Sequence, residues 1–316
     1  MAERDAAMVD LVLDKYRHPE INALAIQIEA LLVATNVRGM ETVRNRGYRG
    51  YLQRAVSTLL RQRERVAIVS GFPVTQGFET DGPAGALALA NGLRQLGSEV
   101  VLLGIDHYIA ALQRCARELQ PSHFMPVAPA CVGDQLRQFV AQFRPTLLVF
   151  VEVPGAGADG RYRNMRFRDI TEQTLPWEQL MSLVDCPTLA FADGGNELGM
   201  GRLHQELHGL PVACAAASTD ELVIADVSNW GVYGALALAS VCVDRPLLQG
   251  FCLVRCLRAL NLEGIVDGVT GACTATEDGL LLGQSVAMFS ALRALAEGAL
   301  AMPESEDIAP LEEDVA

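Results

Sequence analysis

The sequence lacks the short motifs that carry covalent or nucleotide chemistry. None of its 316 residues spells the phosphate-binding pattern G-x-x-x-x-G-K-[ST] or the nucleophile pattern G-x-S-x-G. The five histidines and eight cysteines form no convincing Cys–His pair and no C-x-x-C motif. We therefore expect neither a P-loop nucleotide site nor a serine or cysteine nucleophile.

Basic residues are also scarce. Lys and Arg number 25 against 38 Asp and Glu, which gives a net charge of -13. Nucleic-acid binding needs a basic face that neutralises phosphates, so we expect no nucleic-acid partner. No basic segment followed by an apolar stretch opens the chain, and no uncharged apolar run reaches the roughly 20 residues of a membrane helix. The sequence predicts a reduced, cytoplasmic protein without a membrane segment.

Apolar runs that alternate with helical periodicity are the main fold signal. Continuous apolar runs occupy 66–70, 99–103, 146–153, 188–192 and 222–227, and amphipathic stretches occupy 84–96, 110–119, 133–143 and 177–184. Strands that alternate with helices predict βαβ units, and unbroken apolar strands predict a sheet covered on both faces. The expected fold is a doubly wound α/β structure with a mainly parallel sheet.

The two ends of the chain have a different character. Residues 1–64 carry no strand signal and predict a helical N-terminal extension, with helices at 5–16 and 21–33. Four arginines there, interpreted as a solvated helix face, are Arg44, Arg46, Arg49 and Arg54. We expect one α/β domain over 1–303, with its catalytic core at 65–303, helices at 231–243, 246–260 and 283–300, and an acidic tail at 304–316.

The most informative segment is the loop Asp193–Gly201, which follows an apolar run. It packs four glycines among two carboxylates and an amide, with Asp193, Asn196 and Glu197 as the polar members. Glycine serves where the backbone needs a positive φ or must let a ligand approach closely. Carboxylate and amide oxygens suit a hard cation or a polar substrate. We predict that this loop belongs to an active site and expect a helix over 202–210 after it.

Three further polar segments also follow predicted strands. They are 79–83 with Glu79 and Asp81, the loop 154–170, and 226–231 with Asn229. Ligands of open α/β sheets bind at the carboxyl ends of the strands, so these segments predict one shared site. The later segment 267–279 supplies Asp267 and Asp278 as weaker candidates.

The loop 154–170 carries two competing signals. Gly155, Gly157 and Gly160 formally match the dinucleotide pattern G-x-G-x-x-G, but the amphipathic helix that this pattern requires does not follow. Arginines follow instead, and Arg161 and Arg166 are typical of a clamp for a carboxylate or phosphate. A solvated loop explains the same arginines equally well.

These motifs together resemble the D-glutamate cyclase family. The matching segments are Glu79–Pro83, Asp159–Tyr162 with Asn164–Arg166, Asp193–Gly201, Ser228–Gly231 and Asp267–Gly271, in the family's order. The resemblance implies cyclisation of D-glutamate to 5-oxo-D-proline with loss of water, aided by a divalent cation such as Mn²⁺ or Mg²⁺. It implies a small anionic amino acid as partner and no nucleotide cofactor, and it leaves a homo-oligomer open.

The chemistry of the implied reaction leads to hypotheses about the roles of residues. We expect Asp193 and Glu197, with Asp81, to hold a cation that polarises the γ-carboxylate, Asp169 to take the proton of the substrate ammonium, and Arg161 or Arg166 to hold the α-carboxylate. The predicted catalytic residues are Asp81, Asp169, Asp193 and Glu197. The predicted substrate-binding residues are Glu79, Arg161, Asn164, Arg166, Gly194, Gly195, Asn196 and Asn229.

Three departures from the family pattern keep other functions open. The family has arginine at the positions of Val153 and Ala156, and glycine at that of Phe167. A non-catalytic binder of a small anion is one alternative. An NAD(P)-dependent oxidoreductase that uses Gly155, Gly157 and Gly160 is the other.

Overall fold

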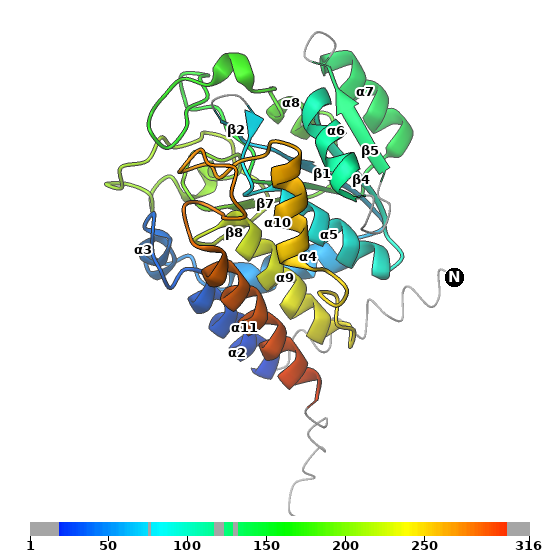
Figure 1. Ribbon diagram of the computed structural model, residues 1–316, viewed down its shortest axis with the longest axis vertical. Coiled ribbons are helices and arrows are strands. Elements are labelled where there is room, and N and C mark those ends of the chain that lie inside the picture. Colours follow the sequence, from blue (N-terminus) through cyan, green and yellow to red (C-terminus); the bar gives the residue numbers. More distant parts are fainter. Residues whose placement is uncertain (1–18, 75–76, 117–122, 129–131, 302–316) are drawn as a thin grey trace, which may run out of the picture.

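The computed structural model describes residues 19–74, 77–116, 123–128 and 132–301 as a parallel sheet with helices on both faces (Figure 1). The six strands run in the order β5-β4-β1-β6-β7-β8, and every neighbouring pair is parallel. Their bounds are β1 Arg65–Ser70, β4 Glu99–Ile105, β5 His123–Val127, β6 Leu147–Val151, β7 Thr188–Ala192 and β8 Glu221–Ile224. The predicted fold class is confirmed.

The central strand β1 lies where the direction of the strand order reverses. Its Ile68 pairs with Leu102 of β4 on one side and with Val149 of β6 on the other. From β1 the chain builds outward to β5, then returns to β6 and builds outward to β8. Open α/β sheets bind ligands outside the carboxyl ends of the strands at such a reversal. A short antiparallel hairpin of β2 Pro73–Val74 and β3 Gly77–Phe78 follows β1 at this edge.

Crossovers between parallel strands are right-handed. Because the strand order reverses at β1, the crossover helices before and after the reversal cover opposite faces of the sheet. The helices that connect strands are α5 Pro83–Gln95, α6 Asp106–Cys115, α7 Val132–Phe143 and α8 Glu178–Met181. Those of the two ends are α2 Pro19–Leu32, α3 Met40–Asn45, α4 Tyr51–Arg61, α9 Ser228–Cys242, α10 Leu253–Leu262 and α11 Leu282–Leu300. The described residues also contain the 3₁₀ turns η3 Thr171–Gln173 and η4 Gly201–Leu203.

Helix α9 is buried along its whole length. It contacts the sheet at β6, β7 and β8 and is surrounded by α2, α4, α5 and α11. All of its residues from Ser228 to Cys242 are buried, which explains a sequence that is apolar on every side. Because α2 and α4 pack on this helix, and α4 also packs on β8, the segment predicted as an extension adjoins the sheet.

The predicted elements agree with the observed ones in most places. All five predicted strands are present, and the helices at 84–96, 133–143 and 231–243 lie within two or three residues of α5, α7 and α9. Strand β5 is absent from the prediction because Pro126 interrupts a short segment, and edge strands tolerate proline. The helix expected at 202–210 is a single 3₁₀ turn followed by turns. The predicted helix 5–16 and the acidic tail lie outside the described residues.

Within the described ranges, no helix is both long and apolar enough to cross a membrane.

Candidate active site

A cavity of about 280 Å³ lies at the carboxyl edge of β1, β6 and β7. This volume lies just below the range of about 300 to 1,000 Å³ that is usual for small-molecule sites. Its walls come from the loops after these strands, from Arg38 and from the segment before α11. The polar lining residues are Arg38, Glu79, Glu152, Asn164, Arg166, Arg168, Asp169, Gln173, Asp193, Asn196, Glu197 and Asp278.

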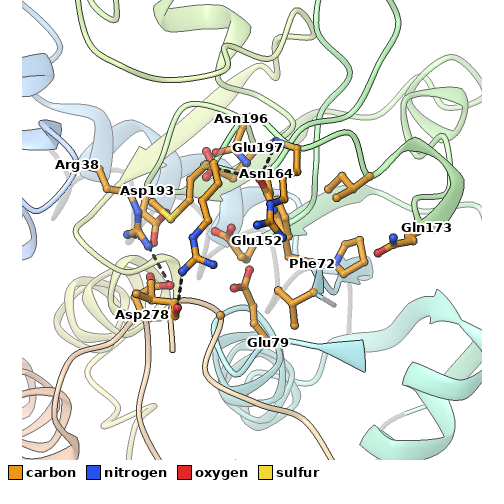
Figure 2. A pocket seen from close by; sticks show the side chains of 18 of the residues that line it. Arg38, Phe72, Glu79, Glu152, Asn164, Gln173, Asp193, Asn196, Glu197 and Asp278 are labelled. Atoms are coloured by element: carbon orange, nitrogen blue, oxygen red, sulfur yellow. Dashed lines mark hydrogen bonds and ion pairs between the residues drawn. The ribbon is translucent and has the colours of Figure 1, made fainter. Parts of the chain in front are cut away.

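Five buried acids form the floor of the cavity. They come from four separate loops and are Glu79, Glu152, Asp193, Glu197 and Asp278. Figure 2 shows Glu79 and Glu152 pointing toward each other, with Asp193 and Asp278 beside Arg38 and with Glu197 on another side. We call these five residues the acidic floor. Such a concentration of carboxylates away from water requires compensation by protons or by cations.

The burial of the acidic floor raises the pKa values of its carboxyl groups. Burial and the negative charge of Glu197 hold the pKa of Glu152 well above its usual range. Burial and the charge of Asp278 do the same to Glu79. For Asp193, burial raises the pKa, whereas the neighbouring Arg38 guanidinium opposes that rise. Strongly perturbed acids in a cavity are typical of catalytic and metal-binding sites.

Two acids of the floor lie on left-handed backbone. Glu152 has a φ of 48° and Asp278 a φ of 54°. Left-handed backbone is uncommon for residues other than glycine, and strain of this kind costs about 1–3 kcal/mol. In Glu152 it turns the chain directly at the end of β6 and directs the carboxyl into the cavity.

Arg38 is a cation of the site whose side chain is only 9% exposed. Its Nη1 lies 3.1 Å from Asp193 Oδ2, and its Nη2 lies 2.9 Å from Asp278 Oδ1. Nη1 also donates to the carbonyl of Asp226 at 3.1 Å. Burial lowers the pKa of Arg38, but Asp193 and Asp278 outweigh that effect and raise it well above its usual value. Arg38 therefore stays charged and joins the turn after α2 to the loops after β7 and before α11.

The loop Asp193–Gly201 owes its shape to its glycines. Gly195 has a φ of 99°, which turns the chain so that its N–H donates to Glu197 Oε2 at 2.7 Å. The loop then pairs with the segment after β6, since the Leu198 N–H donates to the Val153 carbonyl at 2.8 Å. Asn196 adds a bond from its Nδ2 to the carbonyl of Arg163 at 3.0 Å. The acidic loop and the arginine-bearing loop are thus held against each other.

Asp81 and Asn229 cap each other's helices. Asp81 precedes α5, and its carboxylate accepts the N–H groups of Ser228 and Asn229, both at 2.8 Å, at the start of α9. Asn229 Oδ1 accepts the N–H groups of Gly82 and Gly85 at 3.0 and 2.6 Å, at the start of α5. Unpaired N–H groups at helix starts need such acceptors. Neither side chain lines the cavity; both hold the starts of helices next to it.

Replacing Asn229 with alanine is expected to destabilise the fold strongly. Its amide Nδ2 also donates to the Thr80 carbonyl at 3.0 Å and to Glu277 Oε1 at 2.7 Å. The change therefore leaves buried groups unpaired at the start of α5, at Thr80 and at Glu277. We expect the free energy of unfolding, measured by urea denaturation, to fall by about 3 kcal/mol or more. The exposed Asn45→Ala is the control and should change it by no more than about 0.5 kcal/mol. A loss below about 1 kcal/mol for Asn229→Ala would contradict the capping role.

Two groups of carboxylates have the geometry to hold a metal ion, and they share Asp193. One contains Asp81, Asp193 and Asp278, and the other Glu152, Asp193 and Glu197; within each group the ligand oxygens lie within 4.8 Å of one another. Asp278 Oδ2 is buried and has no hydrogen-bond partner among the described residues. All-oxygen ligands fit Mg²⁺ or Mn²⁺. The predicted ligands Asp81 and Glu197 thus fall into different groups.

The arginine-bearing loop forms a hairpin along the rim. Asn164 Oδ1 accepts the N–H groups of Arg166 and Arg168, which turns both residues toward the cavity. Arg166 Nη2 donates to the Val269 carbonyl at 2.7 Å across the opening. Arg161 is exposed, does not line the cavity and lies 3.4 Å from Asp169. Asp169 lines the rim, and hydrogen bonds from Thr171 lower its pKa.

The same hairpin contains the glycines of the dinucleotide pattern. The Gly157 N–H donates to the Arg161 carbonyl at 2.9 Å, and Ala156 pairs with Tyr162. No helix begins between 161 and 170, where every residue is described. Because the pattern binds a pyrophosphate at a helix start, the structure removes the observation that favoured an oxidoreductase.

Four polar residues that line the cavity were not predicted from the sequence: Arg38, Glu152, Arg168 and Gln173. Glu152 was counted as part of an apolar strand at 146–153, although its charge at the strand end was a usable signal. Arg38 lies between two helices of the N-terminal segment, and nothing in its local sequence points to a site formed nearly 160 residues later. The weaker candidate Asp278 joins the site, while Asp267 Oδ1 accepts the N–H groups of Val269 and Thr270 and shapes the loop beside it.

Comparison with known proteins gives the family. A family model described as "D-glutamate cyclase-like, C-terminal" matches residues 28–293. The chain belongs to this D-glutamate cyclase-like family. It is also 31% identical over 208 residues to the human protein named "D-glutamate cyclase, mitochondrial". That alignment covers 58% of this chain and 33% of the human protein, so the chain spans about a third of the length of this relative.

One departure from the family pattern has a structural counterpart in this D-glutamate cyclase-like chain. Phe167, where we expect glycine in the family, has a φ of 60° and a side chain that is 55% exposed. A left-handed conformation suits glycine, and here phenylalanine adopts it at the solvent-exposed tip of the hairpin.

Proposed function

We propose that this chain cyclises D-glutamate, or a close analogue, to 5-oxo-D-proline with loss of water. The observation that carries the proposal is a buried acidic floor that faces an arginine-bearing rim across a cavity of small-molecule size. A substrate with one ammonium and two carboxylates needs both signs of charge around it. The family and the human relative's name support the same reaction.

A divalent cation completes the proposed site. Five carboxylates with one arginine leave an excess of negative charge that would repel the two carboxylates of the substrate. Glu152, Asp193 and Glu197 all line the cavity and would hold the ion. When bound, the ion supplies a Lewis acid that makes the γ-carboxyl carbon a better electrophile. The choice between Mn²⁺ and Mg²⁺ is part of the proposal.

Glu79 is the residue we assign to proton transfer. It lines the cavity, no hydrogen-bond donor to its carboxyl is found among the described residues, and its pKa is raised by burial. Lactam formation makes one C–N bond and breaks one C–O bond. The nitrogen loses two protons, and the departing oxygen gains two and leaves as water. One carboxylate that takes the two protons from the nitrogen and passes them to the departing oxygen therefore balances the reaction.

Asp169 fits that role less well than Glu79. It lies at the exposed rim beside Arg161, and its lowered pKa makes it a weak base. Asp81 and Asn229 take positioning roles, because they hold the starts of α5 and α9 next to the acidic floor. Asn164 shapes the rim, Gly194 and Gly195 hold the Glu197 carboxylate through their backbone, and Asn196 joins its loop to Arg163.

Arg166 is the residue we assign to the substrate α-carboxylate, and its replacement should weaken substrate binding. One of its five donors binds Val269, which leaves the others for a ligand in the cavity. Losing a charge-assisted hydrogen bond should raise the KM of Arg166→Met roughly 10-fold or more in steady-state kinetics. Arg161→Met is the matched comparison and should leave KM unchanged, because Arg161 does not line the cavity. A larger rise in KM for Arg161→Met than for Arg166→Met would assign the α-carboxylate to Arg161 instead.

The direct test of the proposed function is product formation. Purified protein is incubated with D-glutamate or L-glutamate, with Mn²⁺, Mg²⁺ or a chelator, and 5-oxoproline is followed by chiral chromatography. We expect 5-oxo-D-proline from D-glutamate and a loss of turnover with the chelator. Tight binding of glutamate without any product would instead favour the non-catalytic alternative.

A further inference from the structure

Arg38 occupies one of the two carboxylate groups that share Asp193. Its guanidinium contacts Asp193 Oδ2 and Asp278 Oδ1, which are members of the Asp81–Asp193–Asp278 group (Figure 2). A Mn²⁺ or Mg²⁺ ion approaches oxygen ligands to roughly 2.1 Å. A metal at these oxygens would therefore lie against the guanidinium, and two unscreened cations would repel each other.

Asp81 is committed to the helices in the same group. Its Oδ1 accepts the N–H groups of Gly82 and Asn229 at 2.9 and 2.8 Å, and its Oδ2 accepts that of Ser228 at 2.8 Å. It is also absent from the lining of the cavity. Asp278 differs from it: one oxygen binds Arg38, while the buried Oδ2 has no partner among the described residues. This group has the ligands of a metal site but holds a fixed arginine.

The second group is free of that arginine at two of its three members. Glu152 Oε2 accepts the Ser228 hydroxyl at 2.5 Å, and Glu197 Oε2 accepts the Gly195 N–H at 2.7 Å. Both side chains line the cavity, as does Asp193. Neither is among the ion-pair partners of Arg38. All three members of the Glu152–Asp193–Glu197 group are therefore accessible from the cavity, whereas Asp81 of the other group is not in its lining.

We propose that Arg38 is a built-in cation that closes the Asp81–Asp193–Asp278 group to metal, so that the chain binds one divalent ion, at Glu152, Asp193 and Glu197. This inference rests on the metal requirement of the proposed function. It makes Arg38 a positioning residue: it orients Asp193 for the single ion and blocks a second ion on the other side of that carboxylate. Its removal should create a second site rather than only weaken the first.

The test is the number of Mn²⁺ ions bound by the full chain without substrate. Isothermal titration calorimetry gives the stoichiometry, and electron paramagnetic resonance reports whether two ions that share Asp193 are spin-coupled. We expect one ion for the wild type, two coupled ions for Arg38→Met, and one again for Arg38→Met combined with Asp278→Asn. Arg38→Lys, which keeps the charge, should stay at one. Two ions in the wild type, or one in Arg38→Met, would overturn the inference.

Variants that keep Arg38 make the test independent of its effect on folding. In the wild-type background, Glu197→Gln should lower the affinity for Mn²⁺ about tenfold or more, whereas Asp278→Asn should change it by less than about threefold. The opposite ranking places the ion in the other group and refutes the inference, even where the chain still makes 5-oxoproline. A wild-type chain that binds no Mn²⁺ at all contradicts the metal requirement of the proposed function itself.

Discussion

Asp193→Asn is expected to lower kcat/KM for 5-oxoproline formation by about 1,000-fold or more, the largest loss of any single change in the site. Asp193 belongs to both carboxylate groups and binds Arg38 at 3.1 Å. The amide keeps the size of the side chain but removes the charge that orients the arginine and binds a cation. Because the change is nearly isosteric, we expect the loss of kcat/KM without a comparable loss in the free energy of unfolding.

Steady-state kinetics with saturating Mn²⁺ measures this effect, and thermal unfolding of the same samples checks the fold. Asp134→Asn is the control, because Asp134 lies on α7 with its side chain 87% exposed. It should retain the wild-type rate. An Asp193→Asn protein that binds metal and turns over D-glutamate like the wild type would remove Asp193 from the mechanism.

Gly268→Ala is expected to reduce kcat by about 100-fold while leaving the fold intact, since a misplacement of about 1 Å at a reacting group has effects of this size. A Cβ built on Gly268 would lie 1.5 Å from Glu79 Oε2 and 2.7 Å from Glu79 Cδ. The Glu79 carboxylate must therefore move away from its present position. Gly268 does not have a positive φ, so alanine fits the backbone itself.

Gly283→Ala is the matched control for this change. Gly283 lies in the first turn of α11, where an added Cβ would point into open space with nothing within 4 Å. We expect unchanged kinetics and a gain in the free energy of unfolding of about 0.4–1 kcal/mol, because alanine reduces the entropy of the unfolded chain. Full activity of Gly268→Ala would show that the position of the Glu79 carboxylate does not matter for the reaction.

The sequence predicts the fold well where burial decides the local structure. Apolar runs such as Leu147–Val151 read as strands because both faces of the sheet are covered, and α9 reads as a buried helix for the same reason. Strand β5 was not predicted, because it lies at the edge of the sheet and contains Pro126. Its pairing with β4 depends on tertiary context that a local pattern does not contain.

The site was predictable in part, for a physical reason. Carboxylates on the segments that follow parallel strands, such as Glu79 after β1 and Asp193 after β7, can meet at the carboxyl edge of the sheet. Arg38 has no such constraint, because helix packing and not strand order carries it to Asp193. The different roles of two predicted ligands could not be predicted from the sequence either. Asp81 caps α9 and Glu197 lines the cavity, and only the three-dimensional contacts distinguish them.

The most direct test of the central claim compares two proteins in one assay. Wild type and Asp193→Asn, both shown to be folded, receive D-glutamate and Mn²⁺, and the appearance of 5-oxo-D-proline is followed against a sample without protein. We expect product from the wild type and a rate close to the uncatalysed one from the variant. Equal rates in all three samples would contradict the claim that the acidic floor cyclises D-glutamate.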